Sequence, residues 1–205
     1  MPAPRIVIAT HNAHKTGEFR ALLGEAWQVE DLHAFPDLPV PEEDGDSFAA
    51  NAAIKARSAG LRLGEAVLVV ADDSGLEVDA LGGRPGIFSA RYAGAGAGDA
   101  GNRELVLREM AGVPEGERQA RFRCVLAVAR GGVVVASFAG VVEGRLTEVA
   151  SGAGGFGYDP IFVPEGEEAT FGALPAEVKH RRSHRAQALA ELLRWLEDAG
   201  LTKSA

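Results

Sequence analysis

Two adjacent carboxylates, Asp72 and Asp73, follow a hydrophobic run near the middle of the chain. The run, residues 67–71, is rich in β-branched side chains, which is typical of a buried strand. Because burying charge is costly, carboxylates at a strand end are normally exposed, paired or bound to metal. Together with Ser74 and Gly75 they could also form a plain turn. Taken alone, the stretch indicates either a turn or the corner of a site.

A second set of candidate groups lies near the start of the chain. A polar loop there follows a short apolar strand and precedes a helix that we expect to begin near Lys15 or Thr16. Backbone N–H groups at a helix start favour anions, and a lysine adds a positive charge. The residues of the loop are Thr10, His11, Asn12, Ala13, His14 and Lys15.

An acidic run, residues 42–46, precedes a predicted helix over residues 47–63. Acidic side chains at a helix start complement the helix dipole, so a solvated helix start explains the run. Beside a second acidic site, however, Glu42 and Glu43 become candidate metal ligands. One polar stripe of the predicted helix consists of Ser47, Asn51 and Lys55.

Two later segments offer groups for the rest of a ligand. The glycine-rich loop 152–159 contains Phe156, which could be a core residue in an ordinary turn or could stack on a nucleobase. The segment 179–185 is a dense basic cluster, which suits either a solvated helix start or a site for a small anion. The whole chain carries a formal net charge of −8, which argues against broad nucleic-acid binding.

The segments that must position these residues alternate between strand and helix patterns. We expect strands over 5–9, 27–31, 67–71, 76–81 and 160–163, and helices over 15–24, 47–63, 99–110 and 183–199. Residues 120–129 and 133–142 flank Gly131-Gly132 and give the strongest hairpin signal in the chain. The alternation predicts an α/β fold, and the hairpin makes its sheet mixed.

The length of 205 residues suffices for one domain, or for one domain with two lobes. Hydrophobic residues make up 46%, so a sizeable core can form. The one cysteine, Cys124, lies in an apolar strand pattern and is expected to be a small buried hydrophobe. No apolar run approaches the roughly 20 residues of a membrane span. We therefore expect a cytoplasmic protein with no membrane partner.

Two glycine patterns, 96–101 and 152–157, fit the dinucleotide motif G-x-G-x-x-G. That motif requires a strand before it and a helix after it. We expect no strand before the first pattern and a strand, not a helix, after the second. An NAD-type oxidoreductase is therefore disfavoured, and P-loop chemistry is unsupported because the sequence has no G-x-x-x-x-G-K-[ST] loop.

Five of these blocks, in this order and over nearly the whole chain, resemble the inosine triphosphate pyrophosphatase family, also called the non-canonical purine NTP pyrophosphatases. The matching stretches are Ala9–Lys15 with Glu18, Glu42–Ala52 with Lys55-Ala56, Ala71–Leu76 with Gly86–Tyr92, Gly154–Pro160, and Lys179 with Ser183-His184-Arg185 and Ala188-Leu189. The resemblance implies Mg²⁺-dependent hydrolysis of ITP, dITP and XTP to the monophosphate and pyrophosphate, which cleanses the nucleotide pool.

The same resemblance implies an architecture. It is a two-lobed α/β fold around a long twisted mixed β-sheet flanked by helices. The chain would form one domain over residues 1–205 without a separable linker, and two copies would form a homodimer.

The resemblance also implies roles for individual residues. Asp73 would be the general base and a metal ligand, and Glu43, or its neighbour Glu42, would be a second metal ligand. Residues 10–15 would hold the phosphates, with Lys15 also taking part in catalysis. Further substrate-binding residues would be Lys55, Ser74, Phe156, Gly157, Tyr158, Asp159, Lys179, His184 and Arg185.

A nucleotide-binding protein without turnover is the rival interpretation. The presence of Asp73 favours the enzyme, because binding alone does not need a base beside the metal. Donors that face a 6-keto oxygen would reject ATP, whose amino group leaves them unpaired. GTP keeps the 6-keto group, so this contact does not explain how GTP would be rejected.

Overall fold

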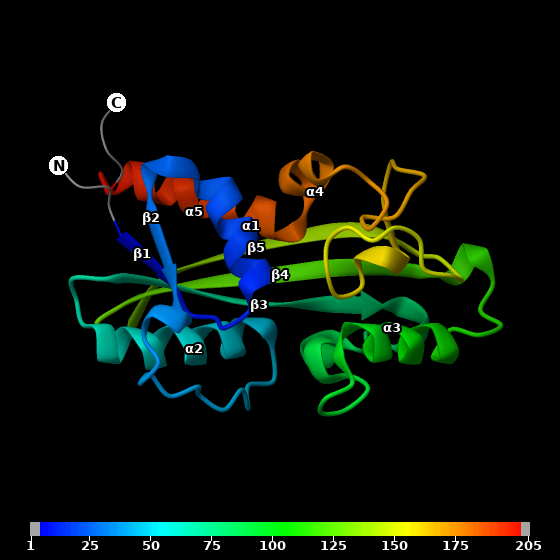
Figure 1. The fold of residues 1–205 in the computed structure, drawn as a ribbon, viewed down its shortest axis with the longest axis horizontal. Coiled ribbons are helices and arrows are strands. Elements are labelled where there is room, and N and C mark those ends of the chain that lie inside the picture. Colours follow the sequence, from blue (N-terminus) through cyan, green and yellow to red (C-terminus); the bar gives the residue numbers. More distant parts are fainter. Residues whose placement is uncertain (1–4, 202–205) are drawn as a thin grey trace. The chain divides into compact units, whose positions relative to one another are not determined.

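Six strands form a mixed sheet in the computed structural model, which describes residues 5–201 (Figure 1). The strands lie in the order β2-β1-β3-β4-β5-β6. Their bounds are β1 Arg5–Ile8, β2 Gln28–Asp31, β3 Leu68–Val78, β4 Gln119–Arg130, β5 Val133–Leu146 and β6 Phe162–Pro164. β1 pairs in parallel with β2 and with β3, whereas β5 pairs antiparallel with β6.

The α-helices lie between and after these strands. Their bounds are α1 Ala13–Leu23, α2 Phe48–Leu63, α3 Gly98–Glu109, α4 Ala176–Arg182 and α5 His184–Asp198. Asn12 and Ser47 are the N-cap residues of α1 and α2, and the side chain of each accepts backbone N–H groups of the first turn. Within residues 5–201, no helix is both long and apolar enough to cross a membrane.

The predicted α/β class with a mixed sheet is confirmed. The parallel strands β1 and β3 are separated by helices, as in α/β units. β4 and β5 are joined by Gly131 and Gly132, whose φ angles are +56° and +82°. A two-residue type I′ hairpin turn requires two successive positive φ angles, which glycine adopts without strain.

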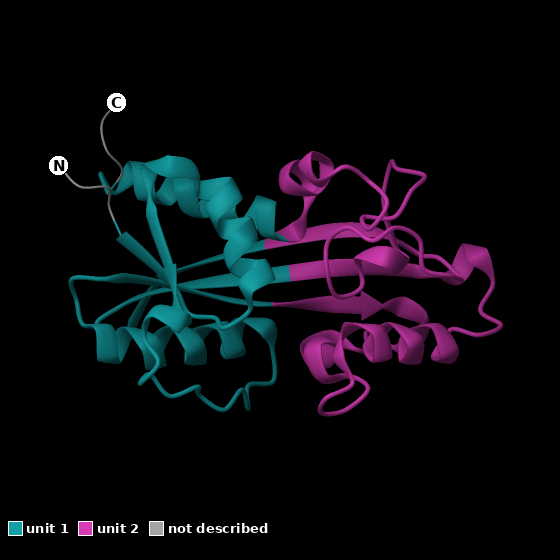
Figure 2. Cartoon of the chain, in the orientation of Figure 1, with its two compact units in different colours: residues 1–73, 124–139, 185–205 teal, residues 74–123, 140–184 magenta. Residues whose placement is uncertain are grey.

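The chain divides into two compact units (Figure 2). Unit 1 comprises Met1–Asp73, Cys124–Ala139 and Arg185–Ala205, and unit 2 comprises Ser74–Arg123 and Gly140–His184. The strands β3, β4 and β5 contribute residues to both units.

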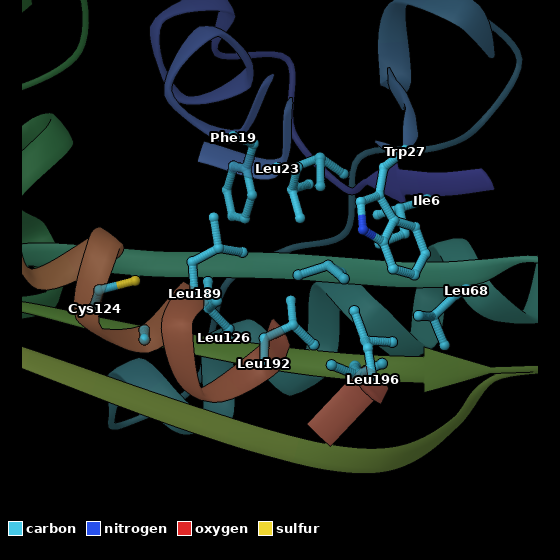
Figure 3. Close-up of a cluster of buried hydrophobic side chains, with 14 residues drawn as sticks. Ile6, Phe19, Leu23, Trp27, Leu68, Cys124, Leu126, Leu189, Leu192 and Leu196 are labelled. Atoms are coloured by element: carbon cyan, nitrogen blue, oxygen red, sulfur yellow. The ribbon is translucent and has the colours of Figure 1, made fainter. Parts of the chain in front are cut away.

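Helices cover both faces of the sheet in unit 1. On one face, α1 and α5 pack their leucines and Phe19 against β1, β3 and β4, as Figure 3 shows. On the other face, α2 buries the small side chains of Ala52, Ala56 and Ala59 against the same strands. The unit 1 part of β3 therefore runs between two helical layers.

Unit 2 has a core of its own that is rich in aromatic side chains. The ring centroids of Phe122 and Phe162 lie 4.6 Å apart, and those of Phe162 and Phe171 lie 5.7 Å apart. Val106 and Met110 of the α3 region belong to the same buried cluster, so this helix is anchored on that core.

Strand β3 is longer than we expected from the sequence. We predicted that one strand would end before Asp72 and another would begin at Leu76, but residues 68–78 form one strand. The prediction was wrong because each buried carboxylate has a cationic partner that offsets the cost of its burial. Helix α4 was also not predicted, and α1 begins at Ala13, earlier than expected.

Candidate active site

Strand β3 directs its two adjacent carboxylates to opposite faces of the sheet, because successive side chains of a strand alternate. Asp72 contacts Lys15 of α1 and Arg185 of α5. Asp73 contacts Lys55 of α2. Lys15 and Arg185 therefore reach β3 from one face and Lys55 reaches it from the other, and all of these residues belong to unit 1.

Asp72 is buried in a network of cations. Its Oδ2 accepts a hydrogen bond of 2.9 Å from Arg185 Nε and one of 3.1 Å from the thiol of Cys124, and its Oδ1 forms an ion pair with Lys15. Burial opposes ionisation, but Arg185 and Lys15 outweigh that effect and hold the pKa of Asp72 well below its ordinary value. Asp72 is therefore an ionised anchor for Lys15.

Arg185 is fully buried, and its guanidinium group joins α5 to two carboxylates. It contacts Asp72 on β3 and forms an ion pair with Glu18 on α1. We predicted that Arg185 binds the nucleotide, and the structure places these guanidinium contacts on the protein's own acids. Arg185 therefore holds Asp72, and a contact with substrate would be a second role of the same side chain.

Asp73 has different surroundings. Its Oδ1 accepts a hydrogen bond of 2.8 Å from Lys55 Nζ, whereas Oδ2 is buried and has no hydrogen-bond partner in the part of the chain that the structure describes. Burial raises the pKa of Asp73, Lys55 partly opposes this rise, and Glu43 adds to it. A carboxylate with a raised pKa and an unpaired oxygen is suited to accept a proton or to bind a cation.

Lys55 links the acidic run to β3. Its Nζ lies 2.8 Å from Asp73 Oδ1 and 3.3 Å from Glu43 Oε2. Burial opposes protonation of Lys55, but Asp73 and Glu43 outweigh it and raise the pKa of the lysine. Glu42 is exposed and has no ion pair within residues 5–201. The structure thus brings Glu43, and not Glu42, to Lys55 and Asp73.

Asn51 fixes the acidic run from α2, one turn before Lys55. The Asn51 side chain is fully buried, and its Oδ1 accepts a hydrogen bond of 2.9 Å from the N–H of Gly45. A Cβ atom at Gly45 would lie only 2.6 Å from that oxygen, so a larger residue does not fit there without movement. This contact positions the segment that carries Glu43.

Neighbouring carboxylates supply donors for a divalent cation. No group of three or more His, Cys, Asp or Glu side chains that could hold a metal occurs in residues 5–201. Mg²⁺, however, is commonly bound by one or two carboxylates, while substrate phosphates and water complete its shell. The unpaired oxygen of Asp73, with Glu43 nearby, fits that kind of site.

The loop before α1 uses several of its polar groups internally. Oδ1 of Asn12 accepts the N–H groups of His14 at 2.9 Å and of Lys15 at 3.2 Å, and the Asn12 N–H donates to Thr10 Oγ1 at 3.1 Å. His11, Asn12, Ala13 and His14 are exposed. Asn12 therefore already satisfies these amides, while the ammonium group of Lys15 contacts Asp72.

In unit 2, a buried carboxylate organises residues 154–159, which we call the base loop. Asp159 Oδ2 accepts hydrogen bonds from the Phe156 N–H at 2.8 Å and from Lys179 Nζ at 2.6 Å. The Lys179 ammonium also lies 4.5 Å from the centroid of the Phe156 ring. Gly155 has a φ angle of +68°, and a Cβ there would lie 2.0 Å from Asp159 Oδ2, so glycine is required.

The other predicted residues of unit 2 are held by its core. Tyr158 is buried, and its hydroxyl donates to the Ser89 carbonyl at 2.8 Å. The His184 ring is buried and stacked on Phe122, with centroids 4.9 Å apart. Ser74 is half-buried on β3, directly after Asp73. The structure thus joins Phe156, Asp159 and Lys179 in one cluster and gives Tyr158 and His184 other neighbours.

Two residues of α3 that the sequence did not single out also hold the base loop. Asp99 Oδ2 accepts a hydrogen bond from the Gly157 N–H, and Arg103 Nη1 donates one to the Gly157 carbonyl. The signal available in the sequence was an acidic residue, Asp99, and a basic residue, Arg103, four positions apart on a predicted helix. That spacing is common on solvated helix faces, so it did not indicate a role.

Comparison with known proteins shows to which family the chain belongs. A model described as the Ham1 family matches residues 6–195. The chain belongs to the Ham1 family. The dITP/XTP pyrophosphatase of Geobacillus kaustophilus is 49% identical over 197 residues, covering 95% of this chain and 96% of the relative. The dITP/XTP pyrophosphatase of Shouchella clausii is 45% identical over 192 residues, covering 94% of this chain and 96% of the relative.

Two solved structures share the fold. The Ham1 protein of Staphylococcus aureus has a TM-score of 0.83 and 38% identity, covering 95% of this chain and 99% of its own. The dITP/XTP pyrophosphatase of Mycobacterium abscessus has a TM-score of 0.73 and 39% identity, covering 92% of this chain and 98% of its own. The family resemblance seen in the sequence is therefore confirmed.

Proposed function

We propose that this Ham1 family member hydrolyses the non-canonical purine nucleoside triphosphates ITP, dITP and XTP to the monophosphate and pyrophosphate. The observation that carries the proposal is the carboxylate pair on β3, with Asp72 locked by cations and Asp73 buried with an unpaired oxygen. Relatives at 45% and 49% identity that are named dITP/XTP pyrophosphatases support the substrate class. Such hydrolysis would keep deaminated bases out of nucleic acid.

The polyphosphate is assigned to unit 1. Lys15 and Lys55 are both largely buried beside carboxylates, with 15% and 12% of their side chains exposed. Water screens such partly buried cations less than it screens surface lysines, so they attract phosphate oxygens more strongly. Residues 10–14 would line the same end, with Thr10 and Asn12 shaping the loop.

Asp73 and Glu43 would hold the divalent cation, which we propose to be Mg²⁺. When bound, the ion supplies positive charge to the phosphate oxygens. The Asp73 carboxylate accepts the proton of a water that attacks the α-phosphorus, and the bond from that phosphorus to the β-phosphate oxygen breaks. Lys15 and Lys55 stabilise the charge that develops on the departing pyrophosphate.

The nucleoside is assigned to unit 2. Phe156 offers a ring for stacking on the base, with the Lys179 ammonium on the ring as a second support. His184 and the backbone N–H groups of the base loop are the candidate donors to a 6-keto oxygen. An adenine amino group would leave such donors unpaired, which strongly penalises ATP.

A substrate panel tests the proposed function. The protein is incubated with Mg²⁺ and with ITP, XTP, GTP or ATP in turn, and pyrophosphate and monophosphate are both quantified. We expect rapid release of both products from ITP and XTP and slow release from ATP. Binding of ITP without formation of product would instead indicate a nucleotide-binding protein without turnover. If none of the nucleotides binds, the assignment of a nucleotide site is wrong.

Metal removal provides a further prediction. Dialysis against a chelator should abolish pyrophosphate release from ITP, because the negative triphosphate would then face Asp73 and Glu43 without an intervening cation. Adding back Mg²⁺ should restore the rate. Full activity after chelation, verified by elemental analysis, would contradict the assignment of Asp73 and Glu43 as metal ligands.

We further propose that the protein is a homodimer and acts in the cytoplasm. Support comes from the resemblance to the inosine triphosphate pyrophosphatase family, in which the same arrangement is expected.

A further inference from the structure

The base loop is held from α3 through both polar groups of a single residue. Asp99 Oδ2 accepts a hydrogen bond of 2.7 Å from the Gly157 N–H. Arg103 Nη1 donates a hydrogen bond of 2.7 Å to the Gly157 carbonyl. Asp99 and Arg103 lie one turn apart on α3 and therefore share a helix face. Together they fix the orientation of the peptide groups on both sides of Gly157.

The base loop needs such a constraint because of its glycines. Gly155 and Gly157 have φ angles of +68° and +59°, and glycine has the largest conformational freedom of all residues. Around Gly157, no atom lies within 4 Å of the position that a Cβ would take. Asp159 holds the loop at the Phe156 N–H, and the two hydrogen bonds from α3 add a constraint at Gly157 itself.

Helix α3 is a rigid support for these two side chains. Its Asn102 is buried, accepting the N–H of Ala93 at 2.8 Å and donating to the carbonyl of Ala90 at 3.1 Å. On the inner face of the helix, Val106 is fully buried in the unit 2 core. The position of Asp99 and Arg103 is thus set by groups other than the loop that they hold.

We propose that Asp99 and Arg103 are positioning residues that keep Phe156 and the base loop in the conformation that receives the nucleobase. This inference rests on the proposed function, because it concerns the same nucleotide. A loop that is competent for only a fraction of the time binds its ligand with a Kd raised by the inverse of that fraction. The effect concerns the nucleoside part of the ligand and leaves the pyrophosphate part, assigned to unit 1, unchanged.

Measuring the binding of each reaction product separately distinguishes an effect on the nucleoside part from an effect on the pyrophosphate part. Calorimetry with Mg²⁺ present measures the Kd of IMP and of inorganic pyrophosphate for the wild type, Asp99→Ala and Arg103→Ala. Hydrogen bonds to charged groups carry enough free energy for an effect of about tenfold, so we expect the Kd of IMP to rise by about that factor in each variant. The Kd of pyrophosphate should stay at the wild-type value.

Matched variants of the same helix serve as controls. Glu104→Ala removes an exposed acid of α3 that has no hydrogen bond or ion pair within residues 5–201, and it should bind IMP like the wild type. Asp99→Asn keeps an oxygen that can accept the Gly157 N–H, so it should recover most of the affinity lost in Asp99→Ala. Hydrogen exchange at the Gly157 amide should accelerate in Asp99→Ala and not in Glu104→Ala.

Each outcome decides between the two proposals. Wild-type affinity for IMP in both alanine variants overturns the positioning role while the proposed function stands. Equal losses of affinity for IMP and pyrophosphate also overturn it, because they indicate a general disturbance of the fold. A wild-type protein that binds neither IMP nor pyrophosphate overturns the proposed function, and the positioning role with it.

Discussion

Asp72 and Asp73 are neighbours in the sequence, yet their pKa values shift in opposite directions. Arg185 and Lys15 hold Asp72 ionised despite its burial, whereas burial raises the pKa of Asp73 more than Lys55 and Lys15 lower it. Environments that shift the pKa values of two neighbouring titratable groups in opposite directions often indicate that the two groups have different acid–base roles. Asp73 is therefore assigned to proton transfer and Asp72 to positioning Lys15.

The variant Asp73→Asn tests the assignment of the base. Because positioned general bases contribute about a hundredfold to ten-thousandfold to rates, kcat for ITP should fall by a factor in that range. The free energy of unfolding at neutral pH should be unchanged or higher, because the amide removes a buried carboxylate whose ionisation is unfavourable. A variant with a wild-type kcat for ITP would reject Asp73 as the base.

The variant Asp72→Asn, unlike Asp73→Asn, should strongly destabilise the fold. Removing one partner of a buried ion pair typically costs about 3–5 kcal/mol, and Asp72 is the shared partner of Arg185 and Lys15. Denaturant unfolding should therefore reveal a large loss of stability, in contrast to Asp73→Asn. If both variants unfold at the same denaturant concentration, the distinction between the two carboxylates is wrong.

The pH dependence of activity follows from the same shifts. The pKa of folded Asp73 is raised above 3.8, so its protonated form stabilises the fold, and this contribution is lost as pH rises through the folded pKa. Activity needs the ionised form, so Asp73 should give kcat/KM an acid limb, which is measured at a fixed Mg²⁺ concentration because a bound cation favours the ionised carboxylate. Asp72 contributes stability above pH 3.8, which is lost as pH falls through its lower folded pKa.

Lys55 provides the variant that tests this pH dependence. Because Lys55 lowers the pKa of Asp73, Lys55→Met should move the acid limb of kcat/KM to higher pH and also reduce the rate. Arg57→Met, at an exposed position of the same helix, should leave the limb in place. An acid limb that stays fixed in Lys55→Met would assign it to a group other than Asp73.

At the scale of elements, the acidic run is held against α2 by one tight contact. In Gly45→Ala the new Cβ would lie 2.6 Å from Asn51 Oδ1 and 2.7 Å from Ala50 Cβ, so the segment that carries Glu43 must move. The Mg²⁺ concentration for half-maximal activity should rise severalfold, as measured by metal titration at saturating ITP.

Gly17→Ala is the matched control for the change at Gly45. Gly17 lies inside α1, and a Cβ there would have no neighbour within 4 Å. Replacing an interior helix glycine by alanine should stabilise the protein by about 0.5–1 kcal/mol without changing the metal requirement. An unchanged metal requirement in Gly45→Ala would separate the acidic run from the metal site.

Local signals predicted most elements correctly. The Gly131-Gly132 hairpin and the helix that begins after Ser47 follow from turn and capping chemistry, which short stretches of sequence reveal. The length of β3 did not follow, because it depends on cations from distant segments that offset the buried charges. Helix α4 was missed because its last turn is a run of basic residues that we assigned to a solvated helix start or to a site for a small anion.

At the scale of the whole molecule, the family resemblance named candidate residues but not the contacts that they make. It named Asp73, Lys55 and Glu43, and the structure places them in contact around one ammonium group. The roles of Asp99 and Arg103 could not be predicted, because their contacts with Gly157 span more than fifty positions of sequence. Only the fold brings those segments together.

The proposed homodimer is tested by the mass of the protein in solution. Sedimentation equilibrium over a range of micromolar concentrations should give twice the chain mass of 21.4 kDa. A mass that matches one chain at all of these concentrations would reject the dimer. That result would leave the chemistry assigned to Asp73 in place, because the residues proposed for it all belong to one chain.

The central claim is that water attacks the α-phosphorus of an inosine or xanthosine triphosphate. Hydrolysis of ITP in water enriched with heavy oxygen, followed by mass spectrometry of both products, tests it directly. The account predicts one heavy oxygen in IMP and none in pyrophosphate, with little turnover in Asp73→Asn. Heavy oxygen in pyrophosphate, or the formation of IDP and orthophosphate, would contradict the account.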